Sequence, residues 1–400
     1  MSALHEKLRG LLGIESVPDV PITQYAVDGK EPQAVVLPKT GDSVGRLVDW
    51  LGVHGYSVIA WGGGTTMTIG NPPGKYDVAL DLRRMNRLVE YTPEDMTVTV
   101  EAGMTLGEFQ HVLAQHAQFL PVEAPERATI GGLIASNRYG PSRLAWGMIR
   151  DWLIGIRFVR GDGKVIHGGG KVVKNVAGYD LCKLLIGSYG TLGIITEATF
   201  KVAPLPLARH TCATTLAQML GIHASPLRPQ FVEMLNTSAC RAAGIQPLAN
   251  DTVVIGIGGT DEEVDWQAAQ LATHPIEFST SSLNEIGAKE EVMLRIVGRF
   301  SEFQTLHRHI VELFGERALI AAHVNLCVFR CAMPMLPTLP ASIMRLRQEY
   351  QVIVERGPSE LKAGVDAWGE VGSSLELMKK IKQQFDPRGM LSVGRFAGGL

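Results

Sequence analysis

The sequence predicts an α+β protein with two or three domains. Its 400 residues are 46% hydrophobic and include 44 glycines, which is more chain than one compact core usually holds. The N-terminal half opens with helical spacing followed by a strand, a βαβ-like start. After Pro204-Leu205-Pro206 the composition of the chain changes. Beyond this point strand and helix candidates alternate, which is typical of an antiparallel α+β domain. We therefore expect a domain boundary between residues 205 and 206.

The elements expected in the N-terminal half follow from apolar periodicity. Asp42 is the expected N-cap of a helix with one apolar face made by Val44, Leu47, Val48 and Leu51. A second helix is expected from Thr105, with Leu106, Phe109 and Leu113 on one face. Gly161-Asp162-Gly163 is typical of a hairpin turn. Alternating or β-branched runs predict strands at 57–61, 78–82, 88–91, 97–101, 151–159 and 194–200.

In the C-terminal half, one amphipathic helix is expected to carry Phe303, Leu306, Ile310 and Leu313. Near the end, Ser373 and Glu376 have capping-box spacing before a helix with Met378, Ile381 and Phe385 on one face. The predicted strands are 211–215, 231–235, 253–257, 324–329 and 352–355.

Charge and cysteine content limit the kinds of function. A net charge of −2 and a pI near 6.6 make nucleic acid a poor partner. No run reaches the roughly 18 apolar residues that a membrane span needs, and the first residues lack a signal-peptide core, so we expect a cytoplasmic protein without a transmembrane segment. The five cysteines are scattered, without iron–sulfur or zinc spacing, which predicts no metal site. Cys327 and Cys331 are interpreted as buried thiols.

The first glycine cluster, WGGGTT, directly follows a predicted strand. Consecutive glycines expose backbone N–H groups that can cradle a phosphate, and the two threonines add hydroxyl donors. The cluster matches neither GxGxxG nor GxxxxGK[ST], which disfavours a Rossmann NAD site and a P-loop. A flexible surface loop is the alternative interpretation.

Two further segments carry glycines next to small or β-branched residues. PVEAPERATIGGLIASNRYG, residues 121–140, offers small residues against which a flat ring could lie; a turn into a short buried helix is the alternative. KNVAGYDLCKLLIGSYGTLGIITEATFKVA, residues 174–203, places glycine turns before a strand. The alternative interpretation is that residues 174–203 form a helix, a turn and a buried strand of an ordinary α/β core, which would show the same sequence pattern.

In this order, WGGGTT, ATIGGLIASN and GSYGTLGIIT resemble the FAD-binding domain of the vanillyl-alcohol-oxidase (PCMH-type) flavoproteins. Within that family the sequence is most similar to the glycolate oxidase FAD-binding E subunit, through residues 80–106 and 140–206 and the tail FDPRGMLSVGR. The resemblance implies a two-lobed FAD-binding domain over 1–205, an antiparallel α+β cap or substrate domain over 206–370, and a segment over 371–400 that returns to the FAD domain.

The resemblance also implies cofactor-binding residues. The pyrophosphate would lie against Gly62, Gly63, Gly64, Thr65 and Thr66. The flavin and ribityl chain would lie against Thr129, Gly131, Gly132, Ser136 and Asn137. Gly193, Ile194 and Ile195 would present backbone to the adenine side or to the ring. Family members with covalent FAD often carry a histidine where this chain has Thr65, so non-covalent FAD is expected.

One departure from the family bears on catalysis. Catalytic 2-hydroxyacid dehydrogenases of the family carry a GHxGDGNxH-like segment that binds metal and takes the substrate proton, and this chain lacks it. The nearest candidate is His323, which alternation would place on one strand face with Asn325. A satisfied core histidine is the preferred interpretation. The E subunit is similarly deficient, so the catalytic residues stay unknown.

Charged residues near these segments leave two interpretations open. Arg150, Asp151 and the group Lys174, Tyr179, Asp180 and Lys183 could position FAD phosphates or a substrate carboxylate, or could form internal ion pairs. The structural role is preferred for Asp180. Arg395 could reach the flavin region from the tail, with a surface arginine as the alternative. Trp61 stands where related loops often have a polar residue.

We therefore expect an FAD-linked oxidoreductase acting on a CH–OH group, as a subunit of a glycolate oxidase or dehydrogenase complex. Its partners would be a homologous catalytic FAD subunit, an iron–sulfur subunit and a small 2-hydroxyacid, with the inner face of the membrane reached only through partner subunits. A self-sufficient FAD-dependent 2-hydroxyacid dehydrogenase or oxidase and a non-catalytic FAD-binding scaffold are the alternatives.

Overall fold

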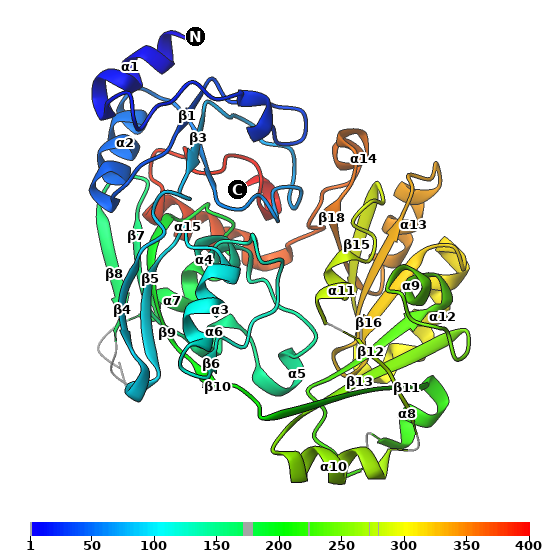
Figure 1. Cartoon of the computed structure of the whole chain (residues 1–400). Helices are drawn as coiled ribbons and strands as arrows, with labels where there is room; N and C mark the ends of the chain where they lie inside the picture. The colour runs from blue at the N-terminus through cyan, green and yellow to red at the C-terminus, as the bar shows by residue number, and fades with distance from the viewer. Residues whose placement is uncertain (1, 171–178, 223–224, 272, 279) are drawn as a thin grey trace.

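The computed structural model describes residues 2–170, 179–222, 225–271, 273–278 and 280–400. The chain forms an N-terminal lobe of two larger sheets and one two-stranded pair, a second lobe (the cap lobe) around one large sheet, and a C-terminal segment that crosses back to the first lobe (Figure 1). This arrangement is α+β, as the sequence predicts. No helix among the described residues has the length and apolar character needed to cross a membrane.

The first sheet of the N-terminal lobe is parallel, with strand order β1-β3-β2. Its strands are β1 (Ala34–Val36), β2 (Val58–Trp61) and β3 (Val78–Asp81). Helix α2 (Gly41–Val53) makes the crossover from β1 to β2 and buries the predicted apolar face. The prediction of Asp42 as its N-cap is wrong: Thr40 caps the helix by accepting a hydrogen bond from Ser43 N, which leaves Asp42 in the first turn.

The second sheet is antiparallel, with strand order β4-β5-β9-β7-β8. Its strands are β4 (Leu88–Thr92), β5 (Thr97–Glu101), β7 (Leu153–Val159), β8 (Val165–Gly169) and β9 (Ile194–Lys201). The predicted hairpin is confirmed, because β7 and β8 pair through the turn that contains Gly163 at φ +81°. Strand β9 is central, so the residues just before it lie inside the lobe and not at its edge.

Short helices cover these sheets. Helix α3 (Leu106–Ala114) begins with a capping box between Thr105 and Glu108, which confirms the predicted helix. The remaining elements of the lobe are α1 (Ala3–Leu12), β6 (Gln118–Phe119), α4 (Ile130–Ser136), α5 (Arg143–Trp146), α6 (Ile149–Trp152), α7 (Leu181–Leu185) and β10 (Ala203–Pro204).

The cap lobe is built on an antiparallel sheet with strand order β14-β11-β13-β12-β16-β17-β15-β18. Its strands are β11 (Ala208–Thr215), β12 (Phe231–Asn236), β13 (Asp251–Gly259), β14 (His274–Pro275), β15 (Val292–Val297), β16 (Leu319–His323), β17 (Val328–Met333) and β18 (Gln351–Arg356). Its helices are α8 (Leu216–Ile222), α9 (Thr237–Ala242), α10 (Asp261–Gln270), α11 (Thr280–Glu285), α12 (Phe303–Phe314), α13 (Leu339–Leu346) and α14 (Ser359–Gly364). We propose residues 206–370 as the extent of this domain.

The predicted strand over 324–329 is wrong. Strand β16 ends at His323, residues Val324–Leu326 form a 3₁₀ turn, and Cys327 adopts φ +50° before β17 begins. Apolar runs of similar composition on both sides of a tight turn conceal the turn from periodicity. Asn325 therefore lies in the turn and does not share a strand face with His323. Strand β16 was missed for the same reason, and β15 was also not predicted.

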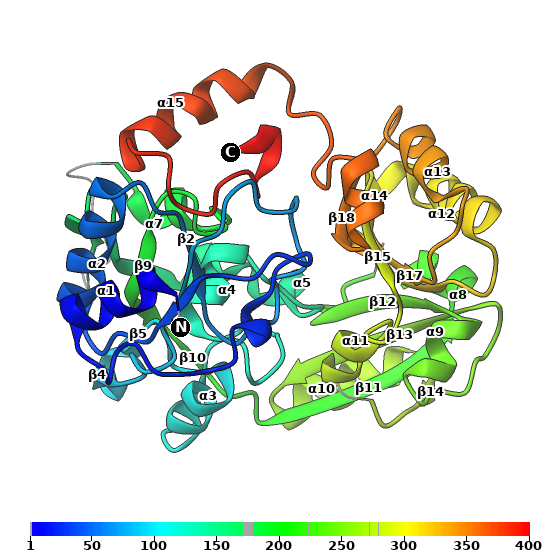
Figure 2. The ribbon, with the colours of Figure 1, turned by 90° about the horizontal axis from the view of Figure 1, so that it is seen from above.

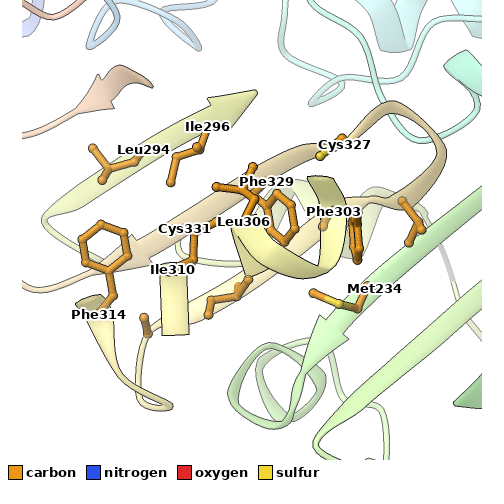
Figure 3. Close-up of a cluster of buried hydrophobic side chains, with 14 of the residues drawn as sticks. Met234, Leu294, Ile296, Phe303, Leu306, Ile310, Phe314, Cys327, Phe329 and Cys331 are labelled. Carbon is orange, nitrogen blue, oxygen red and sulfur yellow. The ribbon is translucent and has the colours of Figure 1, made fainter. Parts of the chain in front are cut away.

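The core of the cap lies between helix α12 and its sheet. Phe303, Leu306 and Ile310 project from α12 toward Leu294, Ile296, Phe329 and Cys331 of the strands (Figure 3). All five cysteines of the chain are free and buried, which confirms the interpretation of Cys327 and Cys331. Burial raises the pKa of the Cys327 thiol to about 11 and also raises that of Cys331.

Replacing Leu306 with alanine is expected to destabilise this core. The side chain is fully buried, so truncation leaves a cavity and should lower the free energy of unfolding by about 2–5 kcal/mol. Urea unfolding followed by circular dichroism measures the change. Leu377→Ala, at a side chain that is 62% exposed, is the control and should shift the midpoint little; equal shifts in both variants would contradict the prediction.

The C-terminal segment returns to the N-terminal lobe. Helix α15 (Leu375–Phe385) crosses over that lobe (Figure 2), and Leu391 then forms a parallel bridge with Val58 of β2. Lys382 secures the return: its ammonium donates to Asp386 Oδ2 (2.7 Å), Leu391 O and Thr191 O. The predicted capping box is wrong, because the helix begins at Leu375 with Ser374 as N-cap and Glu376 pairs with Lys379.

Candidate functional site

The first glycine cluster forms the loop that leaves β2. Trp61, the last residue of β2, is fixed by a hydrogen bond from its Nε1 to the Tyr76 hydroxyl (2.7 Å) and an edge-to-face contact with Tyr25. Gly64 adopts φ +69°, a conformation that favours glycine. Trp61 thus anchors the start of the loop on the sheet, and the chain turns sharply after it.

The second glycine-containing segment packs directly on this loop. A Cβ on Gly63 would lie 1.8 Å from the carbonyl oxygen of Arg127, and one on Gly62 would lie 1.9 Å from Thr129 Oγ1. Only residues without a side chain can approach the neighbouring backbone this closely. Glycine at these positions therefore serves the contact between two chain segments about 65 residues apart in sequence.

The third segment completes the wall from the opposite side. Gly193 precedes β9, and a Cβ there would meet the ring of Phe158 on β7 at 2.6 Å. Ile194 and Ile195 follow as buried residues of β9. Lys174 lies outside the described residues, so its predicted role is not addressed by the structure.

The three segments meet around one cavity. Its walls include nearly all of the predicted cofactor-binding residues: Gly62, Gly63, Gly64, Thr65, Thr66, Thr129, Gly131, Gly132, Ser136, Gly193, Ile194 and Ile195. Asn137 is the exception. It lies at φ +50° in the wall of an adjoining cavity, and its buried Oδ1 has no hydrogen-bond partner among the described residues.

The first cavity fits FAD in size and charge. It encloses about 790 Å³ of empty space, including the part open to solvent, and is lined mainly by glycine backbone, hydroxyls and aliphatic side chains. Among its described lining residues, Arg395 is the one charged side chain and none is acidic. An anionic pyrophosphate would therefore meet backbone N–H groups and threonine hydroxyls without charge repulsion. Within the described part of the chain, no histidine or cysteine contributes to this lining.

Arg395 belongs to this site and is not a surface arginine. Only 5% of its surface is exposed, and its guanidinium donates to the carbonyls of Met67 and Ile69. Asp180 has the structural role preferred for it, because it caps α7 and pairs with Lys183. Tyr179 is 97% exposed, and Asp151 accepts a hydrogen bond from Met148 N. Asp151, Tyr179 and Asp180 do not line the cavity.

An adjoining cavity lies between the N-terminal lobe and the cap sheet. Thr66, Ser136 and Tyr189 line both cavities, so the two share a boundary. The second encloses about 660 Å³ of empty space, including its solvent-open part. Its cap wall comes from the polar residues of β12, β15, β16, β17 and β18: Glu233, Arg295, His323, Arg330 and Glu355.

Three arginines surround one carboxylate in this second cavity. Arg295 and Arg330 are register partners on β15 and β17, and both reach Glu355, at 3.2 and 3.4 Å. Arg138 contributes from the N-terminal lobe. Burial opposes ionisation of Glu355, but Arg330, Arg295 and Arg138 outweigh it and lower the pKa of that carboxyl. Positive charge therefore exceeds negative charge within this group, which favours a small anion.

Arg138 and Arg295 of this cavity differ in how burial and neighbouring charges shift their pKa. Burial, reinforced by the charge of Arg330, lowers the pKa of Arg138 to about 10. For Arg295, burial acts in the same direction, but Glu355 with Tyr139 and Tyr189 keeps the pKa above its usual value. Burial raises the pKa of Tyr189 to about 12, so its hydroxyl stays protonated at neutral pH.

His323 lies in the same cavity, in contact with a buried acid. Its Nδ1 hydrogen-bonds Oε1 of Glu233, whose side chain is 3% exposed, and its ring lies 5.9 Å from that of Tyr139. Burial raises the pKa of Glu233, although His323 opposes the shift. The described residues hold no group of three or more metal-ligating side chains. His323 is thus a partnered histidine that also faces a cavity.

Sequence reasoning missed most of this second cavity. Arg138 and Tyr139 directly follow the ATIGGLIASN segment and were passed over. Arg295, Arg330 and Glu355 are single charged residues within apolar strands, a pattern that can mark a functional wall. Only strand order shows that they meet, because β15, β17 and β18 are neighbours in space.

Comparison with known proteins agrees with this geometry. A family model described as an FAD binding domain matches residues 32–169. The chain is 26% identical to glycolate oxidase subunit GlcD of Bacillus subtilis, over 91% of this chain and 88% of that protein. It is 43% identical to glycolate oxidase subunit GlcE of Escherichia coli over 132 residues, which span 32% of this chain and 38% of that protein.

The fold is that of p-cresol methylhydroxylase, whose substrate-bound crystal structure superposes with a TM-score of 0.76 at 18% identity, over 98% of this chain and 95% of the other. The cofactor is FAD, as the matched FAD-binding model indicates, and the charge and backbone lining of the glycine-lined cavity suit it. The chain therefore contains an FAD binding domain over residues 32–169 and has the fold of p-cresol methylhydroxylase.

Proposed function

We propose that this chain is the FAD-binding subunit of a glycolate oxidase or dehydrogenase complex and takes part in oxidising a 2-hydroxyacid, glycolate to glyoxylate. The observation that carries the proposal is the arginine-rich cavity that shares a boundary with the FAD cavity. A 2-hydroxyacid has a carboxylate next to its reacting C–H bond, so it needs a cation site beside the flavin. The names of the GlcD and GlcE relatives support the substrate class.

The cofactor roles follow from the cavity walls. Gly62–Thr66 would hold the pyrophosphate, and Thr129, Gly131, Gly132 and Ser136 would lie along the flavin and ribityl chain. Gly193, Ile194 and Ile195 would present backbone to the adenine side or ring, and Asn137 would offer its unpaired Oδ1 at the boundary with the second cavity. We propose that FAD is held without a covalent bond, since the described lining offers no histidine or cysteine.

The cap would orient the substrate. Arg295 and Arg330 could bind the carboxylate with charge-assisted hydrogen bonds, while Glu355 keeps both guanidinium groups in place. Tyr189 lines both cavities, and its hydroxyl would bind the substrate hydroxyl there. When bound, FAD supplies the acceptor for the hydride equivalent of the C–H bond.

The electrons would leave through partner chains. The five cysteines here are buried and scattered over both lobes, so a thiolate-bound iron–sulfur centre would belong to another subunit. A homologous catalytic FAD subunit would be a further partner. Cytoplasmic location, with contact to the membrane through those partners, belongs to the same proposal.

A second candidate function is a self-sufficient FAD-dependent 2-hydroxyacid dehydrogenase or oxidase. The contact between His323 and Glu233 favours it, because a histidine oriented by a buried carboxylate is suited to accept a proton. With Nδ1 engaged by Glu233, the proton of the substrate hydroxyl would go to Nε2. A non-catalytic FAD-binding scaffold is the remaining alternative.

Anaerobic titration with glycolate and D-lactate distinguishes these candidates. The FAD-loaded chain is titrated alone and with its co-expressed partner subunits, and the flavin absorbance band is followed. Under the proposed function, bleaching requires the partners and His323→Gln changes the rate little. Bleaching by the isolated chain, slowed about 10²–10⁴-fold in His323→Gln, would instead support the self-sufficient enzyme. Failure to take up FAD would refute both.

A further inference from the structure

A fully buried lysine of the cap reaches the loop that follows the first glycine cluster. Lys362 lies on α14, and its side chain has no exposed surface. Its ammonium donates to the carbonyl oxygen of Thr68 (2.6 Å) and to Oδ1 of Asp28 (2.7 Å). Thr68 is only two residues beyond Thr66, so the cap contacts the chain directly after the first glycine cluster.

A second buried cation holds the same loop from the C-terminal segment. Nη2 of Arg395 donates to Met67 O (2.7 Å) and Ile69 O (2.6 Å), the carbonyls on either side of Thr68. Its Nη1 lies 3.9 Å from Oδ2 of Asp28. Three consecutive carbonyls are therefore held by two buried cations that share one carboxylate, and the three charged groups come from distant parts of the chain.

Neighbouring contacts tie the same segments together. Asn71, at the end of the loop, donates from its side chain to Asp366 Oδ2 and accepts from Ala367 N. Nε1 of Trp368 donates to Arg395 O (2.9 Å), and the hydroxyl of Ser359 donates to Asp28 O. Residues 359–368 are thus bonded to the N-terminal lobe at several points around Lys362.

The buried charges of Lys362 and Arg395 make the contact between the cap and the loop specific. Burial lowers the pKa of Lys362, and the partnership with Asp28 offsets part of that shift; burial also lowers the pKa of Arg395. A buried ammonium is tolerated only where its hydrogen bonds are satisfied, so it constrains the positions of its acceptors more tightly than an apolar contact would.

We infer that Lys362 is a positioning residue for FAD: with Arg395 and Asp28 it sets the conformation of the loop that carries Gly62–Thr66. FAD affinity therefore depends on how the cap is docked, and bound FAD in turn stabilises the docked cap, because coupling between two sites is reciprocal. The inference rests on FAD binding alone and does not depend on the substrate or on the partner subunits.

The test compares Lys362→Met, which keeps length but removes the charge and donors, with Glu360→Gln on the exposed side of the same helix. FAD dissociation constants come from fluorescence titration of the full-length apoprotein, and melting temperatures are recorded with and without FAD. Lys362→Met should weaken FAD binding by about tenfold, and the increase in melting temperature that FAD produces should shrink. Glu360→Gln should leave both unchanged.

A merely structural lysine would give another result. Equal loss of melting temperature in the apo and FAD-bound forms, with an unchanged FAD dissociation constant, would overturn the inference. Asp28→Asn provides a second measurement if Lys362→Met does not fold, because it keeps both cations but removes the carboxylate charge that holds them in place beside the loop carbonyls. It should also weaken FAD binding, and an unchanged FAD affinity in this variant would likewise count against the inference.

Discussion

Alanine at Gly63 should reduce FAD affinity by about 10- to 100-fold, because overpacking of a tight backbone contact usually costs about 1–3 kcal/mol. The added Cβ would lie 1.8 Å from Arg127 O, so either the pyrophosphate loop or the 127–129 segment must move. The second segment is held in place, since Ala128 O accepts from Leu106 N at 2.7 Å. We therefore expect the loop itself to move, which would displace the backbone N–H groups proposed to bind the pyrophosphate.

Flavin fluorescence quenching and the absorbance of the reconstituted protein measure this effect. Gly10→Ala is the matched control, because Gly10 lies in helix α1 with no atom within 4 Å of its missing Cβ. The control should bind FAD like the unmodified chain. Normal FAD binding by the Gly63→Ala protein would show that the glycine cluster does not contact the cofactor, and would contradict the proposed site.

Methionine at Arg330 should leave FAD binding intact and weaken binding of a 2-hydroxyacid by about 30- to 1000-fold, the usual cost of removing one partner from a buried charge pair. In this variant Glu355 still has Arg295 at 3.2 Å, so the carboxylate is not left as an isolated buried charge. The fold should survive, while the cavity loses one of its carboxylate-binding groups.

Two measurements check this prediction. The first is the concentration of glycolate needed for half-maximal flavin bleaching, with the partner subunits present. The second needs no turnover: oxalate, a non-oxidisable carboxylate, should perturb the flavin spectrum of the unmodified protein at far lower concentration than that of the variant. Arg299→Met, which removes an exposed pair with Glu302, is the control. Equal oxalate affinity in both proteins would remove Arg330 from the substrate site.

Local signals predicted much of the fold and of the FAD cavity. The apolar face of α2, the helix from Thr105, the β7–β8 hairpin and strand β9 depend on residues close in sequence, and each was predicted. Errors arose where nearby residues compete for one role. Thr40 rather than Asp42 caps α2, and a 3₁₀ turn at 324–326 interrupts an apolar run.

The sequence by itself therefore determined that this protein is an α+β flavoprotein, since the segments that line the cavity proposed for FAD are each contiguous in sequence, and their order along the chain can be seen directly. Only the tertiary structure decided what lines the adjoining cavity. Arg295, Arg330 and Glu355 are brought together by strand order, and Arg138 joins them because the cap sheet lies against the N-terminal lobe. The same holds for Asp28, Lys362 and Arg395, whose charges meet only because the cap and the C-terminal segment pack on one loop. A linear pattern records neighbours along the chain, whereas electrostatic interaction depends on distance in space.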